Sequence, residues 1–350
     1  EGNGIISRRD LKAYRAVWRK PVSGTYRGIK VISMPPPSSG GVALLQMLRM
    51  AEPFNLSSPE FPDVMGVDPG EAAWVHLLAE IERRVFADRA VYLGDPDFYE
   101  VPVEGLLNDE YLRRRMVSFD PRKASSSSDV TAGTLLSGTQ GDGQSEARTP
   151  GTGALPGESS ETTHFSIVDR EGNAVAVTTT LNGNFGCKVV VDEAGFLLNN
   201  EMDDFSSKPG VPNMFGLIGG EANAIEAGKR MLSSMTPTIL EKDGELFMVV
   251  GSPGGSTIIT TVFQTILNVV DRDMNIRQAE AARRFHHQWL PDRILAERDA
   301  LDPAVTDKLK SMGHQVETTG SIGRCDAILV RDGLYYGGAD SRGDDTAVGY

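Results

Sequence analysis

Thr162 stands at the junction between two segments of different composition. Residues 124–161 are rich in Ser, Gly, Thr and Pro and contain no aromatic residue, whereas residues 162–169 alternate with a period of two, as a strand does. If the chain is cut before Thr162, the new α-amine, whose reference pKa is about 7.7–8.0, can accept the proton of the Thr hydroxyl. Thr with an N-terminal amine is a known nucleophile arrangement. A Thr after a loop is nevertheless more often only the first residue of a strand.

A glycine-rich turn is the second group of residues that can do chemistry. The sequence GSPGGS at 251–256 follows an apolar strand-like run and precedes a helical pattern. Backbone amides at such a turn can converge on an oxyanion or a phosphate. No Lys follows, as a phosphate-binding loop requires, so nucleotide binding is not expected. A strand-to-helix turn without a ligand explains the sequence equally well.

Polar side chains gather in two further segments. Residues 199–204 (NNEMDD) offer amide and carboxylate oxygens that, together with Asn182, can accept hydrogen bonds from a substrate ammonium group. A metal site is the competing interpretation, but the five histidines show no ligand spacing, so we expect no metal. Ser233 and Ser234 can donate hydrogen bonds to a carboxylate, although paired serines are more often turn or capping residues.

The elements that must hold these residues follow from apolar periodicity. Helices are expected over 7–19, 42–51, 71–93, 257–271, 276–282 and 303–312, and strands over 26–34, 162–169, 174–180, 238–241, 246–250, 294–297, 315–318, 327–330 and 334–337. Residues 124–161 are expected to form a flexible linker. Strands clustered with amphipathic helices predict a layered α+β fold with a mostly antiparallel sheet.

Composition and charge exclude several classes of protein. The formal net charge of −13 over 350 residues disfavours nucleic acid and anionic membranes as partners. No run approaches the roughly 18 apolar residues of a spanning helix, and no signal peptide opens the sequence. The start at Glu1 leads us to expect that an N-terminal portion of the natural product is absent. Cys187 and Cys325 are too few for a disulfide framework, and we expect two free thiols.

Taken in chain order, these segments resemble the γ-glutamyltranspeptidase family of N-terminal nucleophile hydrolases. The resemblance covers nearly the whole chain except the 124–161 linker. It is carried by small-subunit motifs at 162–169, 181–182, 198–206, 232–235, 251–255, 284–289 and 347–350, and by large-subunit motifs at 34–41 and 92–96.

The resemblance implies a role for each candidate residue. The chain would cut itself between Glu161 and Thr162, and Thr162 would then attack a γ-glutamyl carbonyl. Thr180 would hydrogen-bond the Thr162 hydroxyl, and the amides of Gly254 and Gly255 would hold the oxyanion. The α-ammonium group of the donor would bind Asn182, Glu201 and Asp204. The α-carboxylate of the donor would bind Ser233 and Ser234.

The resemblance also implies that residues 208–230 form a lid over the pocket. The family's carboxylate-binding arginine would lie before Glu1, so no residue of this sequence is given that role.

The implied architecture is a four-layer αββα sandwich in three parts. Residues 1–123 would be the mostly helical end of a large subunit, 124–161 the linker that ends at the cleavage site, and 162–350 the small, catalytic subunit. The two subunits would stay associated, without cofactor or nucleic acid. Glutathione-like donors would react with water, amino acids or dipeptides, in a periplasmic or extracellular setting.

Two other functions remain open. A related acylase would keep the nucleophile but act on glutaryl or poly-γ-glutamate substrates, and the acidic ammonium site argues against a glutaryl group. An uncleaved or truncated homologue would serve as a structural or binding module.

Overall fold

The computed structural model describes residues 5–56, 71–135 and 162–349. Its helices are α1 Arg8–Ala13, α2 Gly40–Ala51, α4 Glu71–Tyr92, α5 Val103–Leu106, α6 Asp109–Arg115, α7 Ile258–Val270, α8 Ile276–Ala281 and α9 Pro303–Ser311, with 3-10 turns η1 Glu201–Asp204, η2 Glu221–Asn223 and η3 Gly255–Thr257. Its strands are β1 Val22–Tyr26, β2 Ile29–Ser33, β3 Thr162–Val168, β4 Ala174–Thr180, β5 Val190–Val191, β6 Phe196–Leu197, β7 Thr238–Lys242, β8 Glu245–Gly251, β9 Phe285–His286, β10 Ile294–Glu297, β11 Val316–Thr319, β12 Asp326–Arg331 and β13 Leu334–Gly338.

A six-stranded antiparallel sheet in the order β1-β2-β7-β8-β12-β13 forms the centre of the molecule. Strand β2, from the N-terminal part of the chain, pairs with β7 from the C-terminal part, with Val31 opposite Leu240. Both side chains are fully buried. The parts of the chain before and after Thr162 therefore share one sheet and one core.

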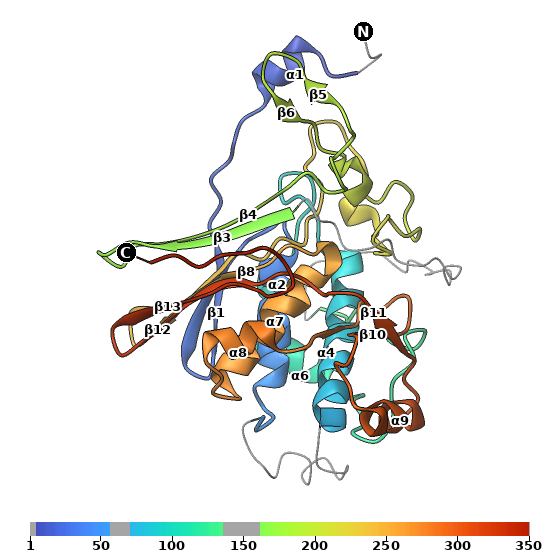
Figure 1. Cartoon of the computed structure of the whole chain (residues 1–350). Coiled ribbons are helices and arrows are strands. Elements are labelled where there is room, and N and C mark those ends of the chain that lie inside the picture. Colours follow the sequence, from blue (N-terminus) through green and yellow to red (C-terminus); the bar gives the residue numbers. More distant parts are fainter. Residues whose placement is uncertain (1–4, 57–70, 136–161, 350) are drawn as a thin grey trace.

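Helices cover one face of this sheet and a hairpin lies over the other (Figure 1). Helices α2, α7 and α8 contact the sheet directly, and α4 packs on α2. On the opposite face, the β3–β4 hairpin contacts β8 and β12. The predicted α+β class with stacked layers is confirmed. The hairpin's outward side chains Phe165, Ile167 and Val175 are exposed.

The N-terminal elements differ from the prediction. The helix expected over 7–19 spans only α1, which begins with a Ser7–Asp10 capping box but buries no residue, so no packing extends it. The single strand expected over 26–34 is a hairpin, because Arg27 and Gly28 take positive φ values of 51° and 78° and turn the chain.

The first part of the expected flexible linker is packed against the core. Ser125 donates to both carboxylate oxygens of Glu80, and the Ser127 carbonyl accepts from the indole of Trp289. Residues 136–161 of the predicted linker lie outside the described residues.

No helix of the described part of the chain is long and apolar enough to cross a membrane. Cys187 is exposed and Cys325 is buried, and both are free thiols, as expected.

Candidate active site

Thr162 is the first residue of β3, and its side chain is 97% shielded from solvent. It pairs in register with Thr180 at the end of β4, and the two hydroxyl oxygens lie 2.8 Å apart. The Thr180 oxygen also accepts the backbone N–H of Asn182 at 2.8 Å. Thr180 therefore connects the predicted nucleophile with a residue of the predicted ammonium site.

His164 shows which way this end of β3 faces. It lies two residues after Thr162 on the same face of the strand, and it is also buried. Its ring packs on Gly251 at the end of β8, where a Cβ would meet the ring at 2.2 Å. Burial lowers the pKa of His164 to about 4, so the ring is neutral at pH 7. Thr162 and His164 therefore lie on the same face of β3. This face is directed toward the end of β8, which leads into the glycine-rich turn.

The glycine-rich turn lies between β8 and α7, as predicted. Gly254 and Gly255 take φ values of 134° and 56°, which L side chains rarely adopt. The Gly254 carbonyl accepts from the backbone and hydroxyl of Thr257, which fixes the turn. Neither glycine amide donates to a backbone carbonyl within the described part of the chain.

Gln288 connects this turn to the predicted lid. Its Oε1 accepts from Ser256 Oγ at 2.8 Å, and its Nε2 donates to the Phe215 carbonyl at 3.0 Å. The Phe215 ring packs on Gly255, where a Cβ would meet it at 2.8 Å. The segment 208–230, predicted to be a lid, therefore contacts the glycine-rich turn through Phe215.

The predicted ammonium site gathers residues from two loops. Asn182 is buried with φ 71°, and its side chain donates to the Asn200 carbonyl at 3.4 Å. Glu201 and Asp204 belong to η1, the next turn of the chain. Burial raises the pKa of Asp204 to about 7, with the charges of Glu201 and Asp203 adding to the shift and Arg89 opposing it. Burial also raises the pKa of Glu201.

Ser233 and Ser234 are held in place by the loop that enters α2. The Ser233 carbonyl accepts from the Ser39 backbone at 2.8 Å and from the Ser39 hydroxyl at 2.7 Å. Gly40 must be a glycine here, because a Cβ would lie 2.3 Å from the Met235 carbonyl oxygen. The sequence PPPSSGG at 35–41 therefore has a structural explanation.

Asn223 and Arg89 lie beside the predicted site residues and were not predicted from the sequence. Asn223 Nδ2 donates to the Asp204 carbonyl at 2.7 Å, and its Oδ1 accepts from the Leu232 backbone at 3.0 Å. It therefore ties the acidic cluster to the serine pair. The guanidinium of Arg89, on α4, contacts Ser39 and Ser234. No sequence signal singled out Arg89, because α4 is buried on all sides from Ala72 to Ala90.

A group of possible metal ligands lies elsewhere. His76, Glu80 and His314 are buried with ligand atoms within 4.8 Å of one another. However, the Glu80 carboxylate already pairs with Arg83 and Arg84, and His76 Nδ1 lies 2.7 Å from His314 Nε2. Two adjacent guanidinium charges oppose a cation, so the cluster fits a structural ion pair better than a metal site.

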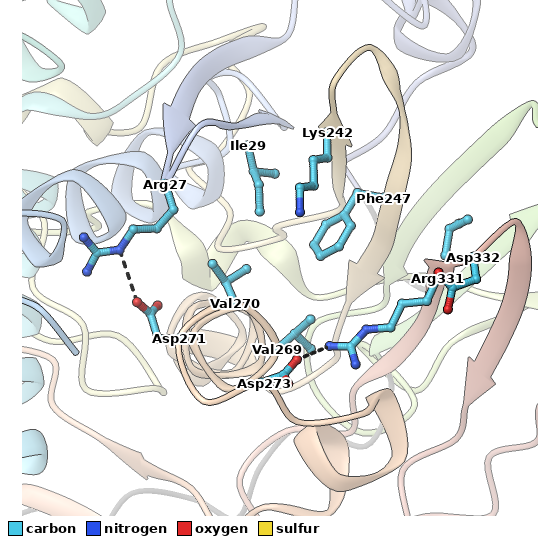
Figure 2. A pocket seen from close by; sticks show the side chains of 11 residues that line it. Arg27, Ile29, Lys242, Phe247, Val269, Val270, Asp271, Asp273, Arg331 and Asp332 are labelled. Atoms are coloured by element: carbon cyan, nitrogen blue, oxygen red, sulfur yellow. Dashed lines mark hydrogen bonds and ion pairs between the residues drawn. The ribbon is translucent and has the colours of Figure 1, made fainter. Parts of the chain in front are cut away.

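A surface pocket of about 540 Å³ lies away from these residues (Figure 2). Its basic residues Arg27 and Arg331 pair with Asp271 and Asp273. None of the predicted site residues lines it. Both arginines of the pocket are thus paired with carboxylates, while its third basic residue, Lys242, lies over the Phe247 ring.

Comparison with known proteins identifies relatives over the whole chain. A family model described as gamma-glutamyltranspeptidase matches residues 1–350. The glutathione hydrolase proenzyme of Escherichia coli (strain K12) is 46% identical over 352 residues, which cover 100% of this chain and 56% of that protein. The corresponding proenzyme of Pseudomonas aeruginosa is 45% identical, covering 98% of this chain and 57% of its own length. The chain therefore spans little more than half the length of these relatives.

Solved structures agree on the fold. A crystal structure of a Helicobacter pylori gamma-glutamyltranspeptidase mutant matches with a TM-score of 0.51 and 55% identity, covering 52% of this chain and 100% of that chain. Cephalosporin acylase from Bacillus halodurans matches with a TM-score of 0.73 and 23% identity, covering 98% of this chain and 55% of that chain. At 23% identity, the similarity to the cephalosporin acylase concerns the fold alone.

Proposed function

This chain belongs to the gamma-glutamyltranspeptidase family, and on that premise we propose that it is a γ-glutamyl hydrolase and transpeptidase that releases its own nucleophile by cleavage before Thr162. The observation that carries the proposal is the buried Thr162 hydroxyl at the start of β3, 2.8 Å from the hydroxyl of Thr180. A nucleophile needs a base and a partner that orients it. The new α-amine would be the base, and Thr180 the partner.

The reaction proceeds in two steps. Thr162 Oγ1 attacks the γ-carbonyl of the donor while its proton passes to the α-amine, and the amides of Gly254 and Gly255 stabilise the oxyanion. The amine of the leaving group takes the proton as the C–N bond breaks, which leaves an ester on Thr162. Water then gives glutamate by hydrolysis, and an amino acid or dipeptide gives transpeptidation. Glutathione-like compounds are the donors of this proposal.

The two charged ends of the donor are recognised by separate groups. Its ammonium binds Asn182, Glu201 and Asp204. The positive charge of the ammonium would favour the ionised form of the Glu201 and Asp204 carboxyl groups. Its carboxylate binds Ser233 and Ser234. A glutaryl donor has no ammonium and would leave the buried Asp204 without a partner, so the acylase alternative is disfavoured.

After cleavage the two parts would stay together. Pairing of β2 with β7 and the shared core support this, because separation would expose buried strands. We place residues 1–123 in the large subunit, 124–161 in the linker and 162–350 in the small subunit, and we place the protein in a periplasmic or extracellular setting.

Intact mass and N-terminal sequencing after incubation at neutral pH test the proposal. We expect fragments 1–161 and 162–350 from the unmodified protein, none from Thr162→Ala, and slower cleavage from Thr162→Ser. The cleaved protein should release p-nitroaniline from γ-glutamyl-p-nitroanilide much faster than from glutaryl-p-nitroanilide. An uncut chain in every sample would instead support the binding-module interpretation, and a preference for glutaryl-p-nitroanilide would support the acylase.

A further inference from the structure

Gln288 uses every hydrogen-bonding position of its side chain. Its Oε1 accepts from Ser256 Oγ at 2.8 Å and from His286 Nε2 at 2.9 Å. Its Nε2 donates to the carbonyl of Phe215 at 3.0 Å and to that of Leu290 at 3.3 Å. A glutamine amide has two acceptor and two donor positions, so all four are occupied. Gln288 is only 5% exposed, and a partner that moved away would leave a buried polar group unpaired, at a cost in free energy.

The directions of these hydrogen bonds follow from the partners. Both partners of Nε2 are backbone carbonyls, which can only accept, so the amide nitrogen must face them. Oε1 therefore faces Ser256 and His286, and each of these gives it a proton. Because the amide group is planar and rigid, its oxygen and nitrogen move together. A shift of the Phe215 carbonyl is therefore passed on to Ser256.

A second contact joins the same two segments. The Phe215 ring packs on Gly255, where a Cβ would meet the ring at 2.8 Å. Gly255 and Ser256 are the first two residues of η3, which runs directly into α7. Phe215 is thus joined to η3 through its ring, at Gly255, and through its carbonyl, by way of Gln288. The position of the glycine-rich turn depends on where Phe215 lies.

The placement of this turn matters for rate more than for donor binding. Backbone amides stabilise an oxyanion only when they are already aimed at the place where its charge develops, and a displacement of about 1 Å can cost about a hundredfold in rate. The residues proposed to bind the two charged ends of the donor belong to other loops, and none of them contacts Gln288 through the hydrogen bonds described above.

We infer that Gln288 is a positioning residue that couples the segment 208–230 to the glycine-rich turn. The turn presents the amides of Gly254 and Gly255 to an oxyanion only while Phe215 packs on it. The inference rests on the proposed function for the reaction that this turn serves. It makes the chemical step, rather than donor binding, depend on the position of 208–230.

Gln288→Leu tests the inference in the cleaved protein with γ-glutamyl-p-nitroanilide. We expect kcat to fall at least about tenfold with KM within about a factor of two, since the loss is one of alignment in the transition state. Phe215→Ala removes the ring contact with Gly255 and should lower kcat by a similar factor. Because both side chains act through one unit, the double variant should be at most about twofold slower than the slower single variant.

A double variant whose loss equals the product of the two single losses would overturn the inference, and so would an unchanged kcat in Gln288→Leu. Gln46→Leu is the matched control, because Gln46 is a buried glutamine whose Nε2 also donates to a backbone carbonyl, that of Leu106. It should lower the unfolding midpoint and leave kcat unchanged. If Gln288→Leu does not fold, Ser256→Ala takes its place in the same cycle, since it removes the hydrogen bond to Oε1 from the other side.

Hydrogen exchange followed by mass spectrometry tests the coupling without turnover. In Gln288→Leu, backbone amides of both 208–230 and 252–258 should exchange at least about tenfold faster than in the unmodified protein, whereas Gln46→Leu should leave both segments unchanged. Faster exchange in only one of the two segments contradicts the inference. A protein that shows the coupled exchange but cleaves no γ-glutamyl amide would refute the proposed function and leave the role of Gln288 standing.

Discussion

The hydroxyl oxygen of Thr180 lies 2.8 Å from that of Thr162 and accepts the Asn182 amide at the same distance. The Asn182 N–H occupies one lone pair of Thr180, so Thr180 meets the nucleophile either with its proton or with its other lone pair. One side chain thus fixes both the orientation of the Thr162 hydroxyl and the start of the loop that carries Asn182.

Replacing Thr180 by Val should therefore slow both self-cleavage and γ-glutamyl-anilide hydrolysis. Loss of a hydrogen bond to the nucleophile costs about 1.5–3 kcal/mol, or about tenfold to hundredfold in rate. Thr180→Ser keeps the hydroxyl and should remain close to the unmodified protein. Thr179→Val is the control, because Thr179 is exposed on the other face of β4. Equal rates for Thr180→Val and Thr179→Val would show that the Thr162–Thr180 contact has no role.

Gly255→Ala should damage the oxyanion turn. Its φ of 56° costs an L-residue about 1–2 kcal/mol, and the new methyl group would displace the Phe215 ring. We expect a loss of at least about tenfold in kcat/KM, measured on the cleaved protein. Gly244→Ala imposes a positive φ without any neighbour within 4 Å, so it should lower stability and leave kcat/KM unchanged. Comparable losses in both variants would mean that only backbone strain matters.

The strongly periodic elements could be predicted from the sequence, and the links between loops could not. The helices expected over 71–93 and 257–271 agree with α4 and α7 to within one residue at each end, because both pack on α2 and are buried along nearly their whole length. The helix expected over 7–19 was too long, since helical propensity without burial does not extend a helix.

The site residues also divide into those that the sequence could locate and those that it could not. Thr162, the glycine-rich turn and the acidic cluster could be located by residue type and order. Asn223 and Arg89 could not, because their partners lie 19 and 145 residues away in the chain. Only long-range packing brings such groups together, and no local pattern records it.

Glu280 gives a pH-dependent contribution to stability. Burial raises the pKa of Glu280 to about 9, and the charges of Asp326 and Asp340 add to the shift. Because its pKa is near 4.3 in the unfolded chain, the folded state keeps a proton that the unfolded state releases between about pH 4.3 and pH 9. This contribution is present at low pH and is lost as the pH rises, by about 1.4 kcal/mol per unit within that window.

The side chain of Gln cannot titrate. The free energy of unfolding of Glu280→Gln, relative to that of the parent protein, should therefore increase from pH 5 to pH 8. Urea unfolding in a Thr162→Ala background, which keeps one uncut chain, measures the difference at each pH. Glu226→Gln, at an exposed position, provides the comparison and should give a difference that does not change with pH. Parallel stability curves for Glu280→Gln and its parent would contradict a protonated Glu280.

Replacing Asn223 should weaken donor binding more than it slows the chemical step. Asn223→Ala leaves the Asp204 carbonyl and the Leu232 amide without their partner, which should lower the free energy of unfolding by about 1–3 kcal/mol. The acidic cluster and the serine pair then lose their common support, while the Thr162–Thr180 contact is untouched. We therefore expect KM for γ-glutamyl-p-nitroanilide to rise about tenfold with kcat within about a factor of two, since the loss is one of substrate binding. Asn173→Ala removes a side-chain hydrogen bond in the β3–β4 turn and should change neither constant. A fall in kcat at constant KM would instead mean that Asn223 supports the nucleophile.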